Sequence, residues 1–364
     1  MKKLKIKPST RSSFTTYAIV TAAFIAVQIM ISTGSASNMF KGLLIPFCVY
    51  SIAAASLNLT VGILGELSLG QAGFMCIGAY SSAIFSVCTK DTITSAWIRF
   101  PIALLIGGIF AAIFGILIGI PVLRLRGDYL AIVTLAFGEI IKNVFNALYV
   151  GYDSSGLHFS LTSQGDLNLA PDGKMLINGA LGVKGMPQDS TFVIGFVVLL
   201  LTLIILYNFI YSSTGRAVMS IRDNRIAAES VGLNITKYKL ITFGLTAFLA
   251  GVAGAIFSHN LSTLQASKFD YNLSILILVF VVLGGIGSIR GSVIAAIVLT
   301  YLPEVLRKLN SDFGKYRMLI YSVVLIVMMI FTSNAKIRGF FAASFAKLKG
   351  LIIKDKNTPA KEAE

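Results

Sequence analysis

The sequence has few charged residues and few of the groups that enzymes use for catalysis. Only 13% of its 364 residues are charged, and it contains 3 cysteines, 2 histidines and 1 tryptophan. Its polar stretches are short, so no part of the chain is long enough for a separate soluble domain. The hydrophobic residues, 55% of the total, lie in runs of about 20, the length that crosses a bilayer core. The sequence therefore predicts an all-α, polytopic transmembrane helical bundle.

The scarcity of cysteine and histidine argues against metal and catalytic sites. Cys48, Cys76 and Cys88 lie in or at the end of apolar runs without metal-ligand spacing, as small buried hydrophobic residues do. His158 and His259 have no second ligand at metal spacing, and no Ser-His-Asp set or carboxylate pair can be assembled. The phosphate-binding Gly-x-x-x-x-Gly-Lys motif is also absent. We expect no catalytic residue, no metal and no cofactor bound by this chain.

Acidic residues are scarce as well, with 16 Asp and Glu against 31 Lys and Arg, a net charge of +15. The positive charges do not form one patch interleaved with exposed aromatic residues, which argues against a nucleic-acid partner. They collect at residues 2–11, 212–239 and 336–361. Basic loops and ends remain on the cytoplasmic side of a membrane, so we expect all three segments there.

Hydropathy predicts about ten spans with both termini in the cytoplasm. They lie near residues 14–32, 43–61, 67–88, 99–122, 129–150, 191–211, 240–258, 273–289, 291–307 and 316–333. The eighth and ninth are short and also fit a re-entrant hairpin, which would leave eight full spans. We expect a retained first span rather than a cleaved signal peptide, because its lysine-rich end anchors a span well.

These spans divide the chain into a transmembrane domain, residues 1–338, and a basic cytoplasmic tail, residues 339–364. Residues 151–190 form an extracytoplasmic loop, in which Asp outnumbers Lys. Residues 212–239 form a cytoplasmic loop, in which Ile221, Ile226, Ala227 and Val231 recur near helical spacing and Gly232 can end a short helix. We interpret this loop as an amphipathic element that docks another protein.

Polar residues inside the apolar runs are candidates for a transport pathway. A carboxylate at mid-membrane costs about 2.5–3.5 kcal/mol, so Glu66 should face a cavity or partner, or lie at the turn between the second and third spans. Glu139 and Lys142, three residues apart in the fifth span, favour either a pore-facing stripe or an ion pair that fastens the helix to a neighbour. The pathway candidates are Glu66, Ser68, Gln71, Thr134 and Glu139.

Two glycine-rich segments interrupt the apolar runs, one in each half of the chain. Such breaks are tolerated where neighbouring groups or water satisfy the backbone, and paired breaks are typical of a central pathway between inverted repeats. The glycines expected to break helices or to allow close packing are Gly62, Gly65, Gly70, Gly73, Gly284, Gly285, Gly287 and Gly291.

Five blocks occur in this order: SLNLTVGILGELSLGQAGFMCIGAY, GDYLAIVTLAFGEIIK, STGRAVMSIRDNRIAAESVGLNITKYKL, LGGIGSIRGSVIAA and LPEVLR. Together they resemble the LivM-type permease family of branched-chain amino acid ABC importers, over roughly Ala54 to Met329. Two segments depart from the family pattern. The extracytoplasmic loop is longer and more polar, with only Gly182–Pro187 similar, and TSNAKIRGFF replaces the usual ending after the last span.

The resemblance implies a permease subunit for Leu, Ile and Val in a bacterial inner membrane. Its implied partners are a second, LivH-type permease, two cytoplasmic ATPase subunits that bind the ATP, and an extracytoplasmic substrate-binding protein. The loop matching Arg216–Gly232 would be the coupling helix, with Glu229 and Gly232 as its matching positions. The coupling-loop residues are Arg216, Arg222, Asp223, Arg225, Glu229 and Gly232.

Two alternatives remain open from the sequence. A stand-alone ion-coupled secondary transporter could use Glu66, Glu139 and Lys142 as ion relays, although it leaves the basic loop without a purpose. An ABC permease for urea or short amides would share the same architecture. A membrane-embedded enzyme would need convergent acid, base or metal residues, which the sequence does not offer.

Overall fold

The computed structural model describes residues 8–34, 37–90, 92–125, 127–153, 156–167 and 173–309, together with 322–323 and 326. The chain divides into two units, Met1–Tyr301 and Leu302–Glu364, and the account below concerns the first. The predicted tenth span, 316–333, lies outside the described residues apart from those three positions, as does the whole tail 339–364.

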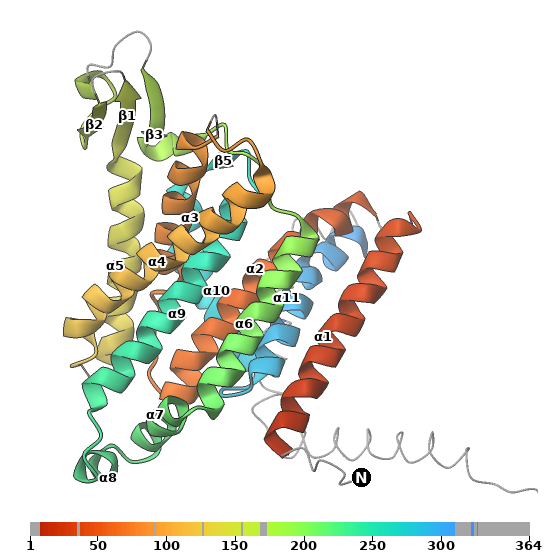
Figure 1. Ribbon diagram of the computed structural model, residues 1–364, viewed down its shortest axis with the longest axis vertical. Helices are drawn as coiled ribbons and strands as arrows, with labels where there is room; N and C mark the ends of the chain where they lie inside the picture. The colour runs from red at the N-terminus through yellow and green to blue at the C-terminus, as the bar shows by residue number, and fades with distance from the viewer. Residues whose placement is uncertain are drawn as a thin grey trace, which may run out of the picture. The chain divides into compact units, whose positions relative to one another are not determined.

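Over the described residues the chain is mostly helical (Figure 1). The helices are α1 (Pro8–Ser32), α2 (Asn38–Asn58), α3 (Gln71–Cys88), α4 (Ala96–Val122), α5 (Asp128–Ala147), α6 (Phe192–Tyr211), α7 (Ser213–Asp223), α8 (Arg225–Ser230), α9 (Ile235–Ser258), α10 (Tyr271–Gly284) and α11 (Ile289–Leu309). A π-helical turn, η1 (Leu59–Leu64), continues α2.

Seven helical segments in the described part of the chain are long and apolar enough to cross a membrane. They are Asn38–Leu64, Gln71–Cys88, Ala96–Val122, Asp128–Ala147, Phe192–Tyr211, Ile235–Ser258 and Ala266–Gly284, and two shorter apolar helices are Val20–Ser32 and Ile289–Pro303. Each of the first nine predicted runs coincides with one of these helices. The prediction of a polytopic helical membrane protein is therefore confirmed.

The core forms where α9 crosses α3 at close range. A Cβ atom on Gly78 would lie 2.2 Å from the Gly251 carbonyl oxygen, and one on Gly254 would lie 2.0 Å from the Met75 carbonyl oxygen. Small residues at such crossings allow two backbones to touch. Apolar side chains such as Ile109 of α4 remain exposed, as expected for helices that face lipid.

The all-α prediction is wrong for the segment after α5, which contains two small sheets. Strands β1 (Tyr149–Asp153), β2 (Gly156–Ser160) and β3 (Lys174–Asn178) form an antiparallel sheet in the order β2-β1-β3. Strand β4 (Val183–Lys184) pairs with β5 (Thr263–Leu264). The predicted fifth span ends early for the same reason: Tyr149 and Val150 hydrogen-bond within the sheet, where aromatic and β-branched residues pack well.

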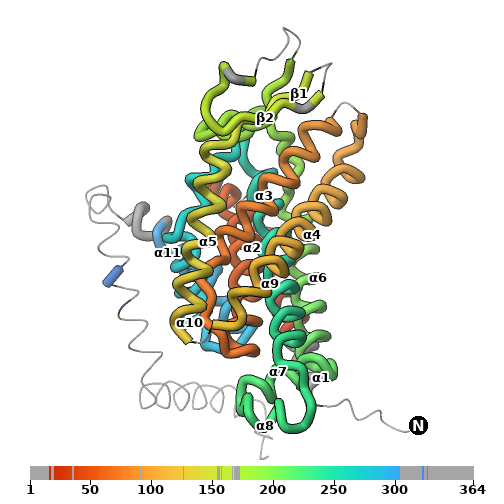
Figure 2. Tube along the Cα trace, turned by 90° about the vertical axis from the view of Figure 1, so that its left-hand side faces the viewer, coloured from red at the N-terminus to blue at the C-terminus, as the bar shows by residue number. Residues whose placement is uncertain are grey.

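Three 3₁₀ turns, η2 (Gly165–Leu167), η3 (Gly179–Leu181) and η4 (Ala266–Lys268), complete the described elements. The first unit therefore has two different ends. Helices α7 and α8 lie at one end of the bundle and strands β1 and β2 at the other (Figure 2). The candidate residues named from the sequence lie at the α7–α8 end, in the breaks that follow α2 and α10, at the start of α3 and within α5.

Candidate functional site

Helices α7 and α8 and the start of α9 fold as one packed helical unit, residues 213–239, which we call the docking unit. Ser212 and Asn224 cap α7 and α8 through hydrogen bonds from the backbone N–H groups of Gly215 and Ala227. Such caps satisfy donors that a helix leaves free at its start. Ile221 of α7, Ala228 of α8 and Ile235 of α9 are buried together, so these three helices are held as one unit.

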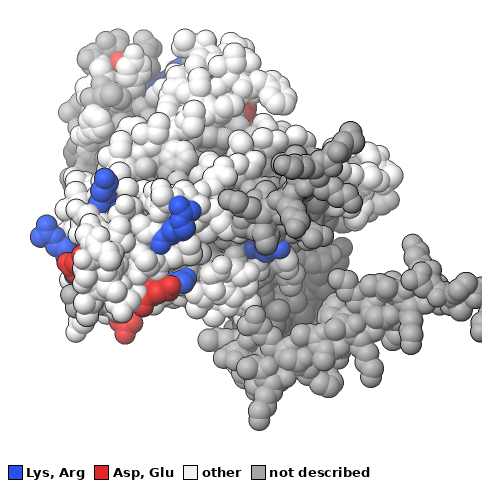
Figure 3. Space-filling view, turned by 60° about the horizontal axis from the view of Figure 1, so that its bottom comes forward, with Lys and Arg blue, Asp and Glu red and all other residues white. Residues whose placement is uncertain are grey.

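The outer face of the docking unit is apolar at its centre. Ile226 and Val231, which helical spacing had grouped with Ile221, are 79% and 77% exposed. The predicted coupling residues Arg225 and Glu229 lie in α8, and Gly232, at φ +82°, is the second residue after its end. Figure 3 shows side chains of both charges at this end of the molecule. Large apolar side chains rimmed by charge are typical of a protein-binding surface.

Two predicted coupling residues do not project from this face. Arg222, whose side chain is 37% exposed, reaches the first break, where its Nη1 donates a hydrogen bond of 2.9 Å to the Gly62 carbonyl oxygen in η1. Its Nε and Nη2 donate to the same Asp223 oxygen at 3.0 and 2.9 Å. Arg216 donates to the Tyr211 carbonyl oxygen at 2.9 Å, back toward the end of α6.

The two predicted glycine breaks meet each other. Gly65, at φ +78°, ends η1, and Gly285 and Gly287, at φ +94° and +83°, lie between α10 and α11. A Cβ atom on Gly62 would lie 2.3 Å from the Gly287 nitrogen. Asn58 joins the breaks: its Oδ1 accepts from the Gly287 N–H at 2.8 Å. Its Nδ2 donates to the Ser292 hydroxyl at 2.7 Å.

Gly284 and Gly291, on either side of the second break, are in direct contact. A Cβ atom on Gly291 would lie 1.7 Å from the Gly284 carbonyl oxygen. Gly73 allows α3 to touch α5, because its Cβ atom would lie 2.8 Å from the Gly138 Cα, and Gly70 approaches Thr134 in the same way. Gly62, Gly70, Gly73, Gly284 and Gly291 therefore allow backbones to approach closely, whereas Gly65, Gly285 and Gly287 supply the positive φ angles at the breaks.

Glu66 lies in the extended segment that joins η1 to α3, at the turn between the second and third predicted spans. It forms an ion pair with Lys239 of α9, and the two side chains are 15% and 6% exposed. Ser68 and Gln71 are both buried. The Gln71 amide donates to the Ala53 carbonyl and to the Ser56 hydroxyl, so it fastens the start of α3 to α2.

Hydroxyl groups of α5 and α10 satisfy the backbone at the start of α3. Thr134 accepts a hydrogen bond from the Leu69 N–H at 3.0 Å, and Ser274 accepts one from the Ala72 N–H, also at 3.0 Å. Thr134 and Ser274 are buried. A broken helix inside a membrane needs such partners because lipid offers none.

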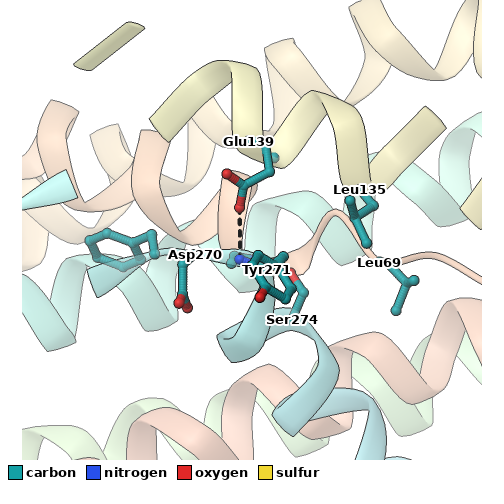
Figure 4. Close-up of a pocket in the computed structure, with 9 residues that line it drawn as sticks. Leu69, Leu135, Glu139, Asp270, Tyr271 and Ser274 are labelled. Atoms are coloured by element: carbon teal, nitrogen blue, oxygen red, sulfur yellow. Dashed lines mark hydrogen bonds between the residues drawn. The ribbon is translucent and has the colours of Figure 1, made fainter. Parts of the chain in front are cut away.

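Glu139 completes this arrangement at the start of α10. Its Oε1 accepts from the Tyr271 N–H at 2.8 Å, and its other oxygen pairs with Lys142. The carboxylate is directed at the first turn of α10, beside a small hollow (Figure 4). The hollow is lined by Leu69, Ala72, Leu135, Gly138, Glu139, Phe269, Asp270, Tyr271 and Ser274. Polar groups of three helices therefore meet at two helix starts.

Sequence reasoning missed several of these partners. Asn58 was visible as an amide in an apolar run, and its spacing from Gly62, one helical turn, was a usable signal. Lys239 belongs to the basic segment 212–239, in which the sequence marks it only as one more positive charge. Ser274 carried no local signal, because its partner Ala72 is 202 residues away. Among the described residues no group of three His, Cys, Asp or Glu lies close enough to hold a metal ion.

Apolar spans, two broken helices that meet inside the bundle, and a helical unit projecting from one end define a membrane transport protein. The chain belongs to the family of permease components of branched-chain amino acid transport systems, whose model matches residues 39–332. The match covers most of the chain, including the docking unit and both helix breaks.

Similar proteins include the high-affinity branched-chain amino acid permeases LivM of Escherichia coli (strain K12) and Salmonella typhimurium. They are 35% and 34% identical over 297 residues, covering 78% of this chain and 66% of each relative. The chain thus spans slightly less than two thirds of their length. The nucleoside ABC transporter permease NupC of Lactococcus lactis is 23% identical over 303 residues, covering 74% of this chain and 85% of that protein. No solved structure matches the chain.

Proposed function

We propose that this chain is a permease subunit of an ATP-binding cassette importer that carries Leu, Ile and Val inward across a bacterial inner membrane. It forms half of the pathway, and a second, LivH-type permease forms the other half. Two cytoplasmic ATPase subunits bind at the docking unit, and an extracytoplasmic binding protein delivers the substrate. Both termini then lie in the cytoplasm, and the strands β1 to β3 lie outside.

One observation carries this proposal: the docking unit has an exposed apolar outer face and an inner face bonded to a helix break. Ile226 and Val231 are the most exposed large apolar side chains of the unit, and Arg222 reaches Gly62 on the other side. The surface proposed for a partner is thereby connected to the paired helix breaks. An importer powered in trans needs such a connection.

The carboxylates argue for an importer over an ion-coupled secondary transporter. Glu66 pairs with Lys239, and Glu139 pairs with Lys142, so each charge is neutralised within the bundle. A cation in transit would have to displace the paired ammonium before it could bind either carboxylate. Leu, Ile and Val present alkyl side chains, and a pathway for them needs few polar groups.

Co-purification and uptake test the proposal. Wild-type chain, expressed with its neighbouring genes, should co-purify with two ATPase subunits and a second permease. Vesicles of this complex should accumulate Leu when given ATP and loaded binding protein. Ile226→Asp should insert normally but lose the ATPase subunits, because it places a charge in the buried centre of the contact. A chain that purifies alone and transports on an ion gradient would overturn the proposal. Uptake of urea, amides or nucleosides in place of Leu would show that the importer carries a different substrate.

A further inference from the structure

Arg222 is one of two side chains that connect the docking unit to the helix breaks, beside Lys239, and the role assigned to it here deepens the proposed function and rests on it. We infer that Arg222 is a positioning residue that transmits movement of α7 and α8 to the contact between Gly62 and Gly287. It is not itself a contact for the ATPase.

The Gly62 carbonyl is an acceptor that needs an outside partner. It belongs to the last turn of η1, and the last carbonyl groups of a helix have no partner within the helix. The chain leaves helical conformation at Gly65. The guanidinium of Arg222 supplies the donor and also places a positive charge at the helix C-terminus, where the dipole favours it. Arg222 therefore stabilises the end of η1.

The stem of Arg222 fits against the same break. A Cβ atom on Gly65 would lie 2.6 Å from the Arg222 Cγ. The Arg222 side chain therefore occupies the space that a side chain at position 65 would need. Asp223 holds the opposite edge of the guanidinium through two hydrogen bonds. These two bonds engage Nε and Nη2 and leave Nη1 facing Gly62.

Gly62 in turn touches the second break. Its Cα is packed against the Gly287 backbone so closely that a Cβ atom would lie 2.6 Å from the Gly287 Cα. Asn58, one helical turn before Gly62, accepts from the Gly287 N–H. If η1 moves with Arg222, the contact between Gly62 and Gly287 must change. A movement of Arg222 therefore affects both broken helices, α2 with η1 and α10 with α11.

The docking unit has the rigidity that a lever requires. Val218 and Ile221 of α7 are buried, and Ile221 packs with Ala228 and Ile235. A Cβ atom on Gly215 would lie 2.3 Å from the Phe209 carbonyl oxygen, so α7 is also tightly joined to α6. Force applied at Ile226 reaches Arg222 through packed side chains.

The test uses the complete importer in vesicles, with loaded binding protein, and compares Arg222→Met with Arg124→Met. Methionine keeps the length of the stem but removes the donors. We expect Arg222→Met to retain both ATPase subunits, to lose the rise in ATP hydrolysis caused by loaded binding protein, and to lower uptake about tenfold or more. Arg222→Lys should recover part of the coupling, because its ammonium can donate to Gly62. Arg124, exposed beyond the end of α4, should tolerate methionine.

Two results would overturn the inference. Loss of the ATPase subunits from Arg222→Met would make Arg222 a docking residue, and unchanged coupling would make its bond to Gly62 incidental. Should Arg222→Met fail to insert, Asp223→Ala decides instead, because it removes the group that orients the guanidinium: reduced coupling with both ATPase subunits retained supports the inference, and wild-type coupling overturns it. Failure of the wild-type chain to assemble with any ATPase would refute the proposed function rather than this inference.

Discussion

Lys239, near the start of α9, forms an ion pair with Glu66 in the segment that joins η1 to α3. Both side chains are largely buried, and the pair connects the docking unit to the first helix break at a second point besides Arg222. Removal of one partner from a buried pair leaves an uncompensated charge, whereas replacement of both by apolar residues is often neutral.

We predict that Lys239→Met lowers the stability of the purified chain by about 3–5 kcal/mol, because Glu66 is left without its cation. The double variant Lys239→Met with Glu66→Leu should recover most of the loss. The apparent melting temperature in detergent measures the stability of the single and the double variant. Lys237→Met, at an exposed position, is the control. Equal melting temperatures for the single and double variants would show that the pair contributes little.

A second prediction concerns the hydroxyl of Thr134. Thr134→Val keeps the shape of the side chain but leaves the Leu69 N–H without its acceptor, which costs about 1–3 kcal/mol. Thr300→Val is the matched control, because the Thr300 hydroxyl is buried and has no hydrogen-bond partner in the part of the chain that the structure describes. We expect Thr134→Val to lower the melting temperature and Thr300→Val to leave it unchanged or raise it. The reverse order would contradict the role given to Thr134.

The helices were largely predictable because the bilayer imposes one simple rule. Runs of apolar residues near the length of a span appear in the sequence whether or not the partners are known. The sheet after α5 was not predictable in the same way. Its register joins Tyr149 to Ser160 and to Asn178, and short strands with many polar residues read as a loop when no apolar run marks them.

A third prediction tests the crossing of α3 and α9. Gly78→Ala places a methyl group 2.2 Å from the Gly251 carbonyl oxygen, so the helices must separate. Overpacking of this kind costs about 1–3 kcal/mol. Gly42→Ala, which meets nothing within 4 Å, should be neutral or stabilise α2, because alanine favours helix over glycine. The yield and the melting temperature are measured for both variants. Equal values for Gly78→Ala and Gly42→Ala would contradict the close crossing of α3 and α9.

The candidate site was predictable in its residue types but not in its pairings. Glu66, Thr134 and Glu139 stood out because polar groups in a membrane are expensive. Their partners lie far along the chain: Lys239 is 173 residues from Glu66, and Tyr271 is 132 residues from Glu139. Such contacts depend on how the helices pack against one another, and the hydrophobic periodicity of a single helix does not predict that packing. Helical spacing also placed Ile226 beside Ile221, although α8 starts anew at Arg225 and turns Ile226 outward.

The last prediction concerns His259, directly after the final residue of α9. Burial lowers its pKa below the ordinary value of about 6.5, although the Ala255 carbonyl and Asp189 act in the opposite direction and Arg99 in the same one. The neutral ring bonds to the Ser86 hydroxyl at 2.7 Å and to the Ala255 carbonyl at 2.8 Å. Below pH 6.5 the unfolded chain binds a proton that the folded chain resists. Stability is therefore greatest above the unfolded pKa and falls as the pH decreases toward the folded pKa.

We expect the apparent melting temperature to fall between pH 7.5 and pH 5.5, the range about one unit either side of the ordinary histidine pKa. His259→Gln should melt lower at pH 7.5, because the bridge from Ser86 to α9 is altered, but its melting temperature should depend less on pH. His158→Gln is the control, since its side chain is 32% exposed in the sheet, and it should retain the fall seen in the wild type. A fall that persists undiminished in His259→Gln would assign the pH dependence to other groups, because a glutamine at this position carries no proton that titrates in this range.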